Sequence, residues 1–190
     1  MALPDPLSGP FSDPHALTRR RALTAFAAAG GVALAVTATQ SAATSPSSVA
    51  AGDLAPDVAL PESPVGQRLS DLRGRLVYLD FWASWCTPCR LSFPWMGELQ
   101  KRHGGRGLQV VAVNLDVRRA DADAFLARHP AGIAVAFDPR GVSAEAFGVR
   151  AMPTSVLIGP DRRVLAVHRG FRLEDAPALE AKVVAALPGR

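Results

Sequence analysis

The sequence predicts one α/β domain with a mixed sheet, preceded by a leader of different composition. The chain has 190 residues, of which 48% are hydrophobic and 20% charged, enough to bury one compact core. From about residue 53, short apolar runs alternate with helix-like segments and end in two short runs and a final helix. The first fifty residues show no such alternation. We therefore assign residues 1–50 to a leader and residues 51–190 to the domain.

The leader has the layout of an export signal. Three arginines, Arg19–Arg21, precede a mildly apolar stretch over residues 22–38, and small residues follow. Paired arginines before a weak apolar stretch resemble the twin-arginine export class, whose passengers fold before crossing the membrane. Small-residue cleavage patterns end at Ala38 and at Ala50, and an uncleaved membrane anchor is the alternative. The Ser/Thr/Ala-rich remainder is expected to be a flexible tether.

The net charge of +4 does not indicate a nucleic-acid-binding protein. Without residues 1–50 the chain keeps 18 basic and 15 acidic side chains. These are scattered, and neither a basic stripe nor interleaved aromatic residues are found. We therefore expect no nucleic-acid partner.

The first half of the domain contains the most strongly patterned segments. Residues 57–60 are expected to form a short edge strand, closed by Pro61. Residues 76–81 are apolar on both faces, which is typical of a central strand covered on each side. The helix predicted after them ends at two glycines, 104 and 105. Its apolar residues recur at four-residue spacing: Leu91, Trp95 and Leu99.

The second half continues the alternation and ends in a hairpin. The predicted elements are a strand at 110–113, a helix at 121–129, a strand at 134–137, a helical turn at 143–147, strands at 155–158 and 164–168, and a helix at 173–187. The turn Gly159-Pro160-Asp161 joins the last two strands. Strand–helix alternation followed by a hairpin and a helix predicts a sandwich with a mixed central sheet.

The chain has two cysteines, Cys86 and Cys89. A structural zinc site needs four ligands, and the four histidines lie at unrelated spacings, so we expect no metal site and no cofactor. A disulfide framework would need more cysteines. One redox-active pair is the remaining interpretation. The alternative is a chaperone that binds Cu(I) through both thiols, although no Met or His lies beside the motif.

The predicted position of the pair suits disulfide exchange. The cysteines open the helix after the central strand, where free backbone N–H groups and the positive end of the macrodipole stabilise an anion. We therefore expect Cys86 to ionise readily to a thiolate. Three-residue spacing brings both sulfurs to one helical face, so Cys89 can attack a mixed disulfide on Cys86. Pro88 is compatible with the first helical turn.

The sequence around the cysteines resembles the thioredoxin superfamily. Trp-Cys-x-x-Cys follows a strand that ends in Asp-Phe-Trp-Ala. Independent matches are Pro94 inside the helix, Met152-Pro153-Thr154 at the position of the family's cis-proline loop, and Gly170 after the last strand. A helix–strand insertion around residues 121–137 resembles the insertion that marks the membrane-associated or periplasmic branch of the superfamily, to which TlpA and ResA belong. The resemblance covers about residues 55–187 and implies a three-layer thioredoxin-like sandwich.

The resemblance also implies roles for individual residues. Cys86 and Cys89 would be the catalytic pair, with Thr87 and Pro88 completing the redox motif. Asp80 lies where thioredoxins have a buried acid that accepts the proton of the second cysteine, and burial is expected to raise its pKa. Many ResA-like proteins have Asn there and a Glu three residues after the second cysteine, where this chain has Ser92.

Three further residues are expected to bind substrate. Trp85 flanks the cysteines as a contact surface, the alternative being a place in the core. If Pro153 is cis, Met152 would present its backbone to an extended substrate chain, a β-augmentation mode.

Together these features predict an exported thiol–disulfide oxidoreductase that reduces disulfides in exported proteins. The resemblance implies protein disulfide substrates such as apocytochrome c and copper-site thiols, a membrane thiol relay as the reductant, and a periplasmic or other extracytoplasmic location. We expect a monomer. A peroxiredoxin-like peroxidase is a rival, but the Pro-x-x-x-Thr/Ser-x-x pattern of those enzymes is missing before Cys86.

Overall fold

The computed structural model describes residues 48–189, so the expected export signal lies outside the described residues. The strands are β1 (Leu76–Trp82), β2 (Leu108–Asn114), β3 (Ala134–Phe137), β4 (Thr154–Ile158) and β5 (Val164–Arg169). The α-helices are α1 (Cys89–His103), α2 (Arg119–Arg128), α3 (Val142–Ala146) and α4 (Ala176–Ala186), and three 3-10 turns are η1 (Leu69–Leu72), η2 (Gly104–Arg106) and η3 (Leu173–Asp175).

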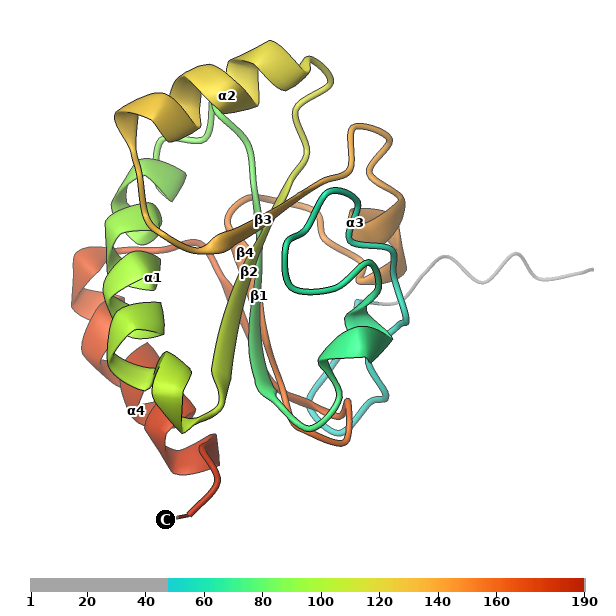
Figure 1. The fold of residues 1–190 in the computed structure, drawn as a ribbon, viewed down its shortest axis with the longest axis vertical. Helices are drawn as coiled ribbons and strands as arrows, with labels where there is room; N and C mark the ends of the chain where they lie inside the picture. Colours follow the sequence, from blue (N-terminus) through green and yellow to red (C-terminus); the bar gives the residue numbers. More distant parts are fainter. Residues whose placement is uncertain (1–47, 190) are drawn as a thin grey trace, which may run out of the picture. The chain divides into compact units, whose positions relative to one another are not determined.

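The five strands form one mixed sheet in the order β3-β2-β1-β4-β5 (Figure 1). β1 is central, parallel to β2 and antiparallel to β4. The pair β2 and β3 is parallel, whereas β4 and β5 are antiparallel and form the predicted hairpin. The mixed sheet is therefore confirmed. The predicted helix–strand insertion is also present, as α2 and β3, and it adds β3 at the edge beside β2.

The sheet separates two apolar clusters, because successive side chains of a strand point to opposite faces. On one face Val77, Leu79 and Phe81 of β1 pack with residues of η1, α3 and the segment before η1. On the other face Tyr78 and Trp82 pack with α1, α2 and α4. Figure 1 shows α1 and α4 on one side of the sheet and α3 on the other. The predicted three-layer arrangement is thus observed.

The predicted edge strand at residues 57–60 is wrong. The segment makes a single bridge, between Ala59 and Arg68, and joins none of the five strands. Its backbone pairs instead with the loop that follows: the Leu60 N–H donates to the Gln67 carbonyl at 2.7 Å. Prolines at 56 and 61 flank the segment and lack the N–H groups that a longer ladder would need.

The helix α1 is confirmed, but its predicted apolar stripe is only partly buried. Leu99 is fully buried and Trp95 is half-buried against the same cluster, whereas Leu91 is 46% exposed. The buried face also includes Cys89, Phe93 and Met96, at the first, fifth and eighth positions of the helix. This i, i+4, i+7 spacing is a regular helical stripe. The rotation of α1 about its axis is therefore the one that turns the second cysteine inward.

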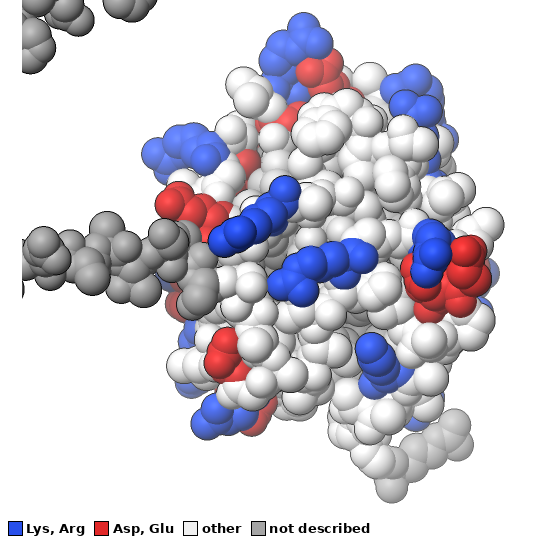
Figure 2. Space-filling model, turned by 180° about the vertical axis from the view of Figure 1, so that it is seen from behind, with Lys and Arg blue, Asp and Glu red and all other residues white. Residues whose placement is uncertain are grey.

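Charged side chains of both signs are interspersed over the face shown in Figure 2, without a continuous basic stripe on that face. Most ion pairs join exposed side chains, such as Arg118 with Asp121 at 2.7 Å. Such pairs contribute little to stability. Within residues 48–189, none of the helices has the length and apolar character needed to cross a bilayer.

Candidate functional site

The two cysteines form a disulfide where β1 gives way to α1. The Cα atoms of Cys86 and Cys89 are 5.3 Å apart and the sulfurs 2.06 Å apart, so the structure shows the oxidised form. Cys89 is completely buried, whereas Cys86 is 4% exposed. Cys86 is therefore the more accessible of the two sulfurs to an incoming thiol or disulfide.

The helix begins slightly later than the sequence suggested. Cys89 is the first residue of α1, Pro88 occupies the N-cap position, and Cys86 precedes the helix. A tight turn still connects the cysteines, because the Cys89 N–H donates to the Cys86 carbonyl at 3.2 Å. Cys86 thus lies next to the positive end of α1 rather than inside its first turn. The positive end of the helix dipole can still stabilise a thiolate at this position.

Asp80 is buried on the face of the sheet that α1 covers. It is 1% exposed and shares that face with its strand neighbours Tyr78 and Trp82. Ser155 of β4 donates a hydrogen bond from Oγ to Oδ1 of Asp80 at 2.7 Å. Burial raises the pKa of Asp80 to about 7, while the Ser155 hydrogen bond opposes the shift. A carboxyl with this pKa exchanges protons near neutral pH.

Buried aromatic side chains pack in the same apolar cluster as the two cysteines. Trp82 is fully buried, with its ring 4.5 Å from that of Phe93 and 4.8 Å from that of Phe125. Trp85, three residues on, is 68% exposed. The exposed position contradicts the alternative that Trp85 belongs to the core. Thr87 and Pro88, between the cysteines, are exposed as well.

The Met152-Pro153 loop lies at the same end of the sheet as the disulfide. Phe81 near the end of β1 pairs with Thr154 at the start of β4, which brings the residues before Thr154 beside those after Trp82. The Met152–Pro153 peptide bond is cis, as predicted. Met152 is half-buried against the apolar cluster that contains both cysteines. No hydrogen bond within residues 48–189 involves its backbone N–H or C=O.

The structure adds a polar clamp that sequence reasoning missed. Asp116 accepts hydrogen bonds from the backbone N–H of Ser84 at 2.9 Å and from its Oγ at 3.0 Å. Asn114 at the end of β2 donates from Nδ2 to the same carboxylate at 2.7 Å. This Ser84–Asp116–Asn114 clamp fixes the loop two residues before Cys86. A polar residue that ends a buried parallel strand, followed two residues later by an acid, is the signal that could have revealed it.

Three exposed apolar side chains lie on the segments at this end of the sheet. Trp85 precedes Cys86, Leu91 in the first turn of α1 is 46% exposed, and Val117, the residue after the clamp in the loop that follows β2, is 83% exposed. Exposed apolar side chains gathered in this way are typical of a surface that binds another molecule.

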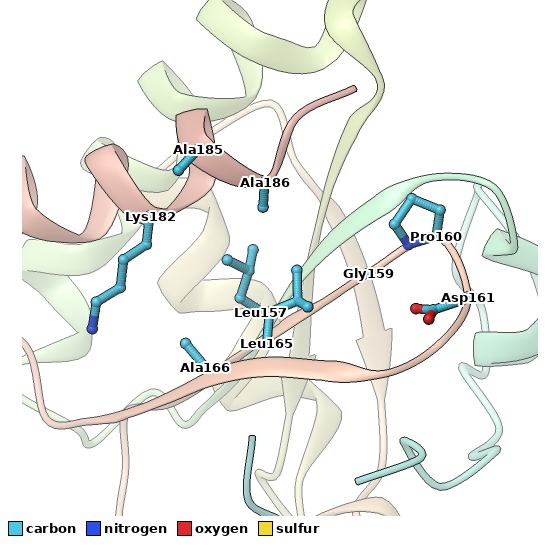
Figure 3. Close-up of a pocket in the computed structure, with 9 residues that line it drawn as sticks. All are labelled: Leu157, Gly159, Pro160, Asp161, Leu165, Ala166, Lys182, Ala185 and Ala186. Atoms are coloured by element: carbon cyan, nitrogen blue, oxygen red, sulfur yellow. The ribbon is translucent and has the colours of Figure 1, made fainter. Parts of the chain in front are cut away.

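A groove lies in a part of the domain that does not include the cysteines. It has a volume of about 730 Å³ and runs between α4, β4 and β5, with the turn Gly159-Pro160-Asp161 at one end (Figure 3). Its side chains are mainly apolar, and Lys182 and Asp161 supply its charges. Neither the cysteines nor Asp80, Trp85, Met152 or Pro153 line it. Within residues 48–189 no group of three or more His, Cys, Asp or Glu side chains gathers as metal ligands would.

Comparisons with known proteins point to one chemistry. A model of the Redoxin family matches residues 50–184. The chain is 34% identical over 129 residues to the thiol-disulfide oxidoreductase ResA of Bacillus subtilis, covering 67% of this chain and 72% of that protein. It resembles the crystal structure of a candidate thiol:disulfide interchange protein DsbE from Chlorobium tepidum, with 54% identity and a TM-score of 0.71 over 74% of this chain and 100% of that one. A candidate protein disulfide isomerase from Bacteroides thetaiotaomicron has 25% identity and a TM-score of 0.65, over 73% of this chain and 91% of that one.

Proposed function

Because the chain belongs to the Redoxin family and is a thiol–disulfide oxidoreductase, we propose that it reduces disulfides in exported proteins through Cys86 and Cys89. The observation that carries this proposal is the cysteine pair itself. The pair is closed as a disulfide, one sulfur is more accessible than the other, and a buried acid that titrates near neutral pH lies on the same face of the sheet.

The proposed reduction has two exchange steps. The Cys86 thiolate attacks one sulfur of the substrate disulfide, forming a mixed disulfide and releasing the other substrate sulfur as a thiolate, which takes a proton from solvent. The Cys89 thiol then gives its proton to Asp80, and its thiolate attacks the Cys86 sulfur. The Cys86–Cys89 disulfide forms and the second substrate thiolate leaves. Two electrons have passed from the protein to the substrate.

Substrate binding is assigned to residues around the disulfide. The exposed ring of Trp85 supplies apolar contact area. The backbone groups of Met152, next to Pro153, make no hydrogen bond within the described residues, so they are free to pair with an extended segment of a substrate protein. An unfolded or extended chain that carries a disulfide is the substrate class that fits these two features.

The remaining parts of the proposal concern location and electron supply. Residues 1–50 would direct export, which places the domain in the periplasm or another extracytoplasmic compartment. A membrane thiol relay would then reopen the Cys86–Cys89 disulfide after each turnover. The protein would act as a monomer, because each proposed role is filled by residues of one chain.

Substitution of each cysteine tests the assigned roles. Cys86→Ser should abolish turnover, because the attacking sulfur is lost. Cys89→Ser should still attack, but it cannot resolve the intermediate, so mixed disulfides with substrate proteins should accumulate. Non-reducing electrophoresis with mass spectrometry detects them, and the double variant is the control. Failure of Cys89→Ser to trap any substrate would contradict these roles.

The reduction potential of the pair tests the direction of the reaction. The full chain would be equilibrated with dithiothreitol or glutathione buffers, with tryptophan fluorescence as the readout. We expect a value near or below about −220 mV, as in reductases, whereas a value near −120 mV would identify an oxidant. If no reversible disulfide forms, the oxidoreductase cycle fails, and stoichiometric Cu(I) binding by the two thiols becomes the better explanation.

A further inference from the structure

A row of polar side chains crosses the sheet outward from Asp80. Asp80 of β1 is paired with Ser155 of β4, and Ser155 is paired with His168 of β5. Residues directly opposite each other on antiparallel strands project from the same face. The three side chains therefore share the face covered by α1 and α4, and the 2.7 Å hydrogen bond from Ser155 to Asp80 joins the first two.

The row becomes more exposed toward the sheet edge. Asp80 is 1% exposed, whereas the side chain of His168 is 26% exposed and that of Asp175, in η3, is 22% exposed. Nε2 of His168 lies 3.7 Å from Oδ2 of Asp175. The row thus leads from a carboxyl without solvent contact to an imidazole–carboxylate pair at the surface.

A small cavity lies along the row. It has a volume of about 10 Å³ and is lined by Tyr78, Ser155, His168 and Lys182, together with apolar side chains of β4, β5 and α4. Within the described residues, three of the six buried polar atoms without a hydrogen-bond partner belong to this region: Asp80 Oδ2, Tyr78 Oη and His168 Nε2. Two of these three belong to residues that line the cavity. A cavity of this size, with these polar groups along part of its lining, is about large enough for one water molecule.

We propose that Ser155, His168 and Asp175 form a proton path through which Asp80 exchanges its proton with solvent. The path rests on the proposed function, in which Asp80 receives the proton of Cys89. The Asp80 carboxyl passes its proton to Ser155 Oγ, and a water molecule in the cavity carries the hydroxyl proton of Ser155 to His168 Nε2. Because Nε2 is buried, His168 then releases the proton of its other ring nitrogen, Nδ1, to solvent. Only O–H and N–H bonds change, so the electrons stay with the sulfurs.

His168 is an imidazole with charged neighbours. An imidazole is the side chain that gains and loses a proton most readily near neutral pH. Asp175 lies 3.7 Å from Nε2, and Lys182 of α4 lines the same cavity as His168. Arg172 also pairs with Asp175, at 3.5 Å. His168 acts through Asp80 and does not touch the sulfurs, so it is a positioning residue rather than a catalytic one.

The test measures proton exchange at Asp80 directly. The oxidised full chain would be labelled with ¹³C, and the Asp80 carboxyl resonance would be assigned by its loss in Asp80→Asn. Line-shape analysis near the titration midpoint gives the rate of exchange between the protonated and ionised forms. We expect His168→Ala to slow this exchange at least about tenfold and added imidazole to restore it, which a purely structural role would not produce.

Two further variants sharpen the test. His168→Gln keeps much of the side-chain volume but cannot carry a proton, so it should slow the exchange without rescue by imidazole. His103→Gln is the matched control, because His103 also pairs with a carboxylate, Glu180, at 2.7 Å on the same face of the sheet. We expect this control to leave the exchange rate unchanged.

The outcomes separate the two proposals. If Asp80 titrates but both His168 variants exchange at the native rate, the path is wrong and the role of Asp80 in the reaction still stands. If Asp80 does not titrate between about pH 5 and pH 9, it cannot accept the proton of Cys89 near neutral pH. In that case both the path and this step of the proposed function fail.

Discussion

At the scale of single residues, the environment of Asp80 decides its chemistry. The sequence places an acid near the end of an apolar strand, and the structure surrounds it with buried side chains and one hydrogen-bond donor, Ser155. One donor does not replace the hydration that a carboxylate loses on burial, so the neutral form is favoured. Tyr78 responds in the same direction, because burial and then the nearby charge of Asp80 raise the pKa of its hydroxyl.

The raised pKa of Asp80 has a consequence for stability. The folded protein holds this proton up to a pKa of about 7, whereas the unfolded chain releases it near its ordinary value of 3.8. The free energy of unfolding should therefore fall as the pH rises from about 4 to about 7, and then level off. Asp80→Asn removes this fall. We expect the variant to match the native protein below about pH 4, to exceed it by about 1.5 kcal/mol at pH 5, and to exceed it by up to about 4 kcal/mol at pH 8.

Urea unfolding of the two oxidised proteins at both pH values measures the difference. If the free energy of unfolding depends on pH in the same way in both proteins, Asp80 ionises in the folded state as readily as in the unfolded chain.

At the scale of elements, parallel pairing places the catalytic loop. β1 and β2 run side by side in register from Leu76 opposite Leu108 to Trp82 opposite Asn114. Their carboxyl ends therefore meet, and the loop after β2 supplies Asp116 to the loop after β1. A carboxylate that accepts several hydrogen bonds in a buried position holds a loop more firmly than neutral groups do. The clamp thereby fixes the backbone that leads into Cys86.

Removal of the clamp should loosen this loop selectively. Asp116→Ala leaves the backbone N–H of Ser84 and the amide of Asn114 without their acceptor. We expect a loss of about 2–4 kcal/mol in the free energy of unfolding. Amide hydrogen exchange should also be faster at residues 84–86, before any global unfolding.

Asp57→Ala is the control for this prediction. Asp57 likewise accepts a backbone hydrogen bond, from Ser70 at 2.9 Å, but this bond is in the segment before β1. The Asp57→Ala variant should be less stable than the native protein, but its amide hydrogen exchange at residues 84–86 should be unchanged. Unchanged exchange in Asp116→Ala would mean that the loop is held by packing alone.

At the scale of the whole molecule, the thioredoxin-like fold includes a segment that precedes its first strand. Val49 is 9% exposed and Ala55 is 1% exposed, and both belong to the apolar cluster on the face opposite α1. The backbone is tied to β5 as well: the Gly52 N–H donates to the Val164 carbonyl at 2.8 Å, and the Val164 N–H donates to the Asp53 carbonyl at 2.9 Å. We therefore expect the folded domain to begin no later than Val49.

Truncation tests this boundary. A chain that begins at Ser48 keeps every one of these contacts, so we expect it to unfold at the same urea concentration as the full chain. A chain that begins at Pro56 loses the two apolar side chains and the pairing with β5. It should be less stable by about 2–4 kcal/mol. Equal stability of the two truncated chains would show that residues 48–55 contribute nothing to the fold.

Most of the fold could be predicted because its signals are local. Alternation of apolar runs gave the order of strands and helices, and the residue pattern Gly159-Pro160-Asp161 gave the hairpin. Two predictions based on local pattern alone needed correction. The apolar run at 57–60 pairs with a neighbouring loop instead of joining the sheet, and of the stripe Leu91, Trp95 and Leu99 only Leu99 is fully buried. The packing of α1 against the sheet, which local spacing does not encode, decides which side of the helix is buried.

The sequence by itself determined the chemistry and the class of fold. Two cysteines three residues apart, between a buried strand and a helix, are enough to predict a redox pair, because the reactivity of a thiol follows from its immediate surroundings. The tertiary structure alone decided which polar groups gather around that end of the sheet. The clamp from Asp116 and the polar row from Asp80 through Ser155 to His168 depend on strand order and register. These bring together residues that are 32, 75 and 13 positions apart in the chain, and no local pattern encodes such distances.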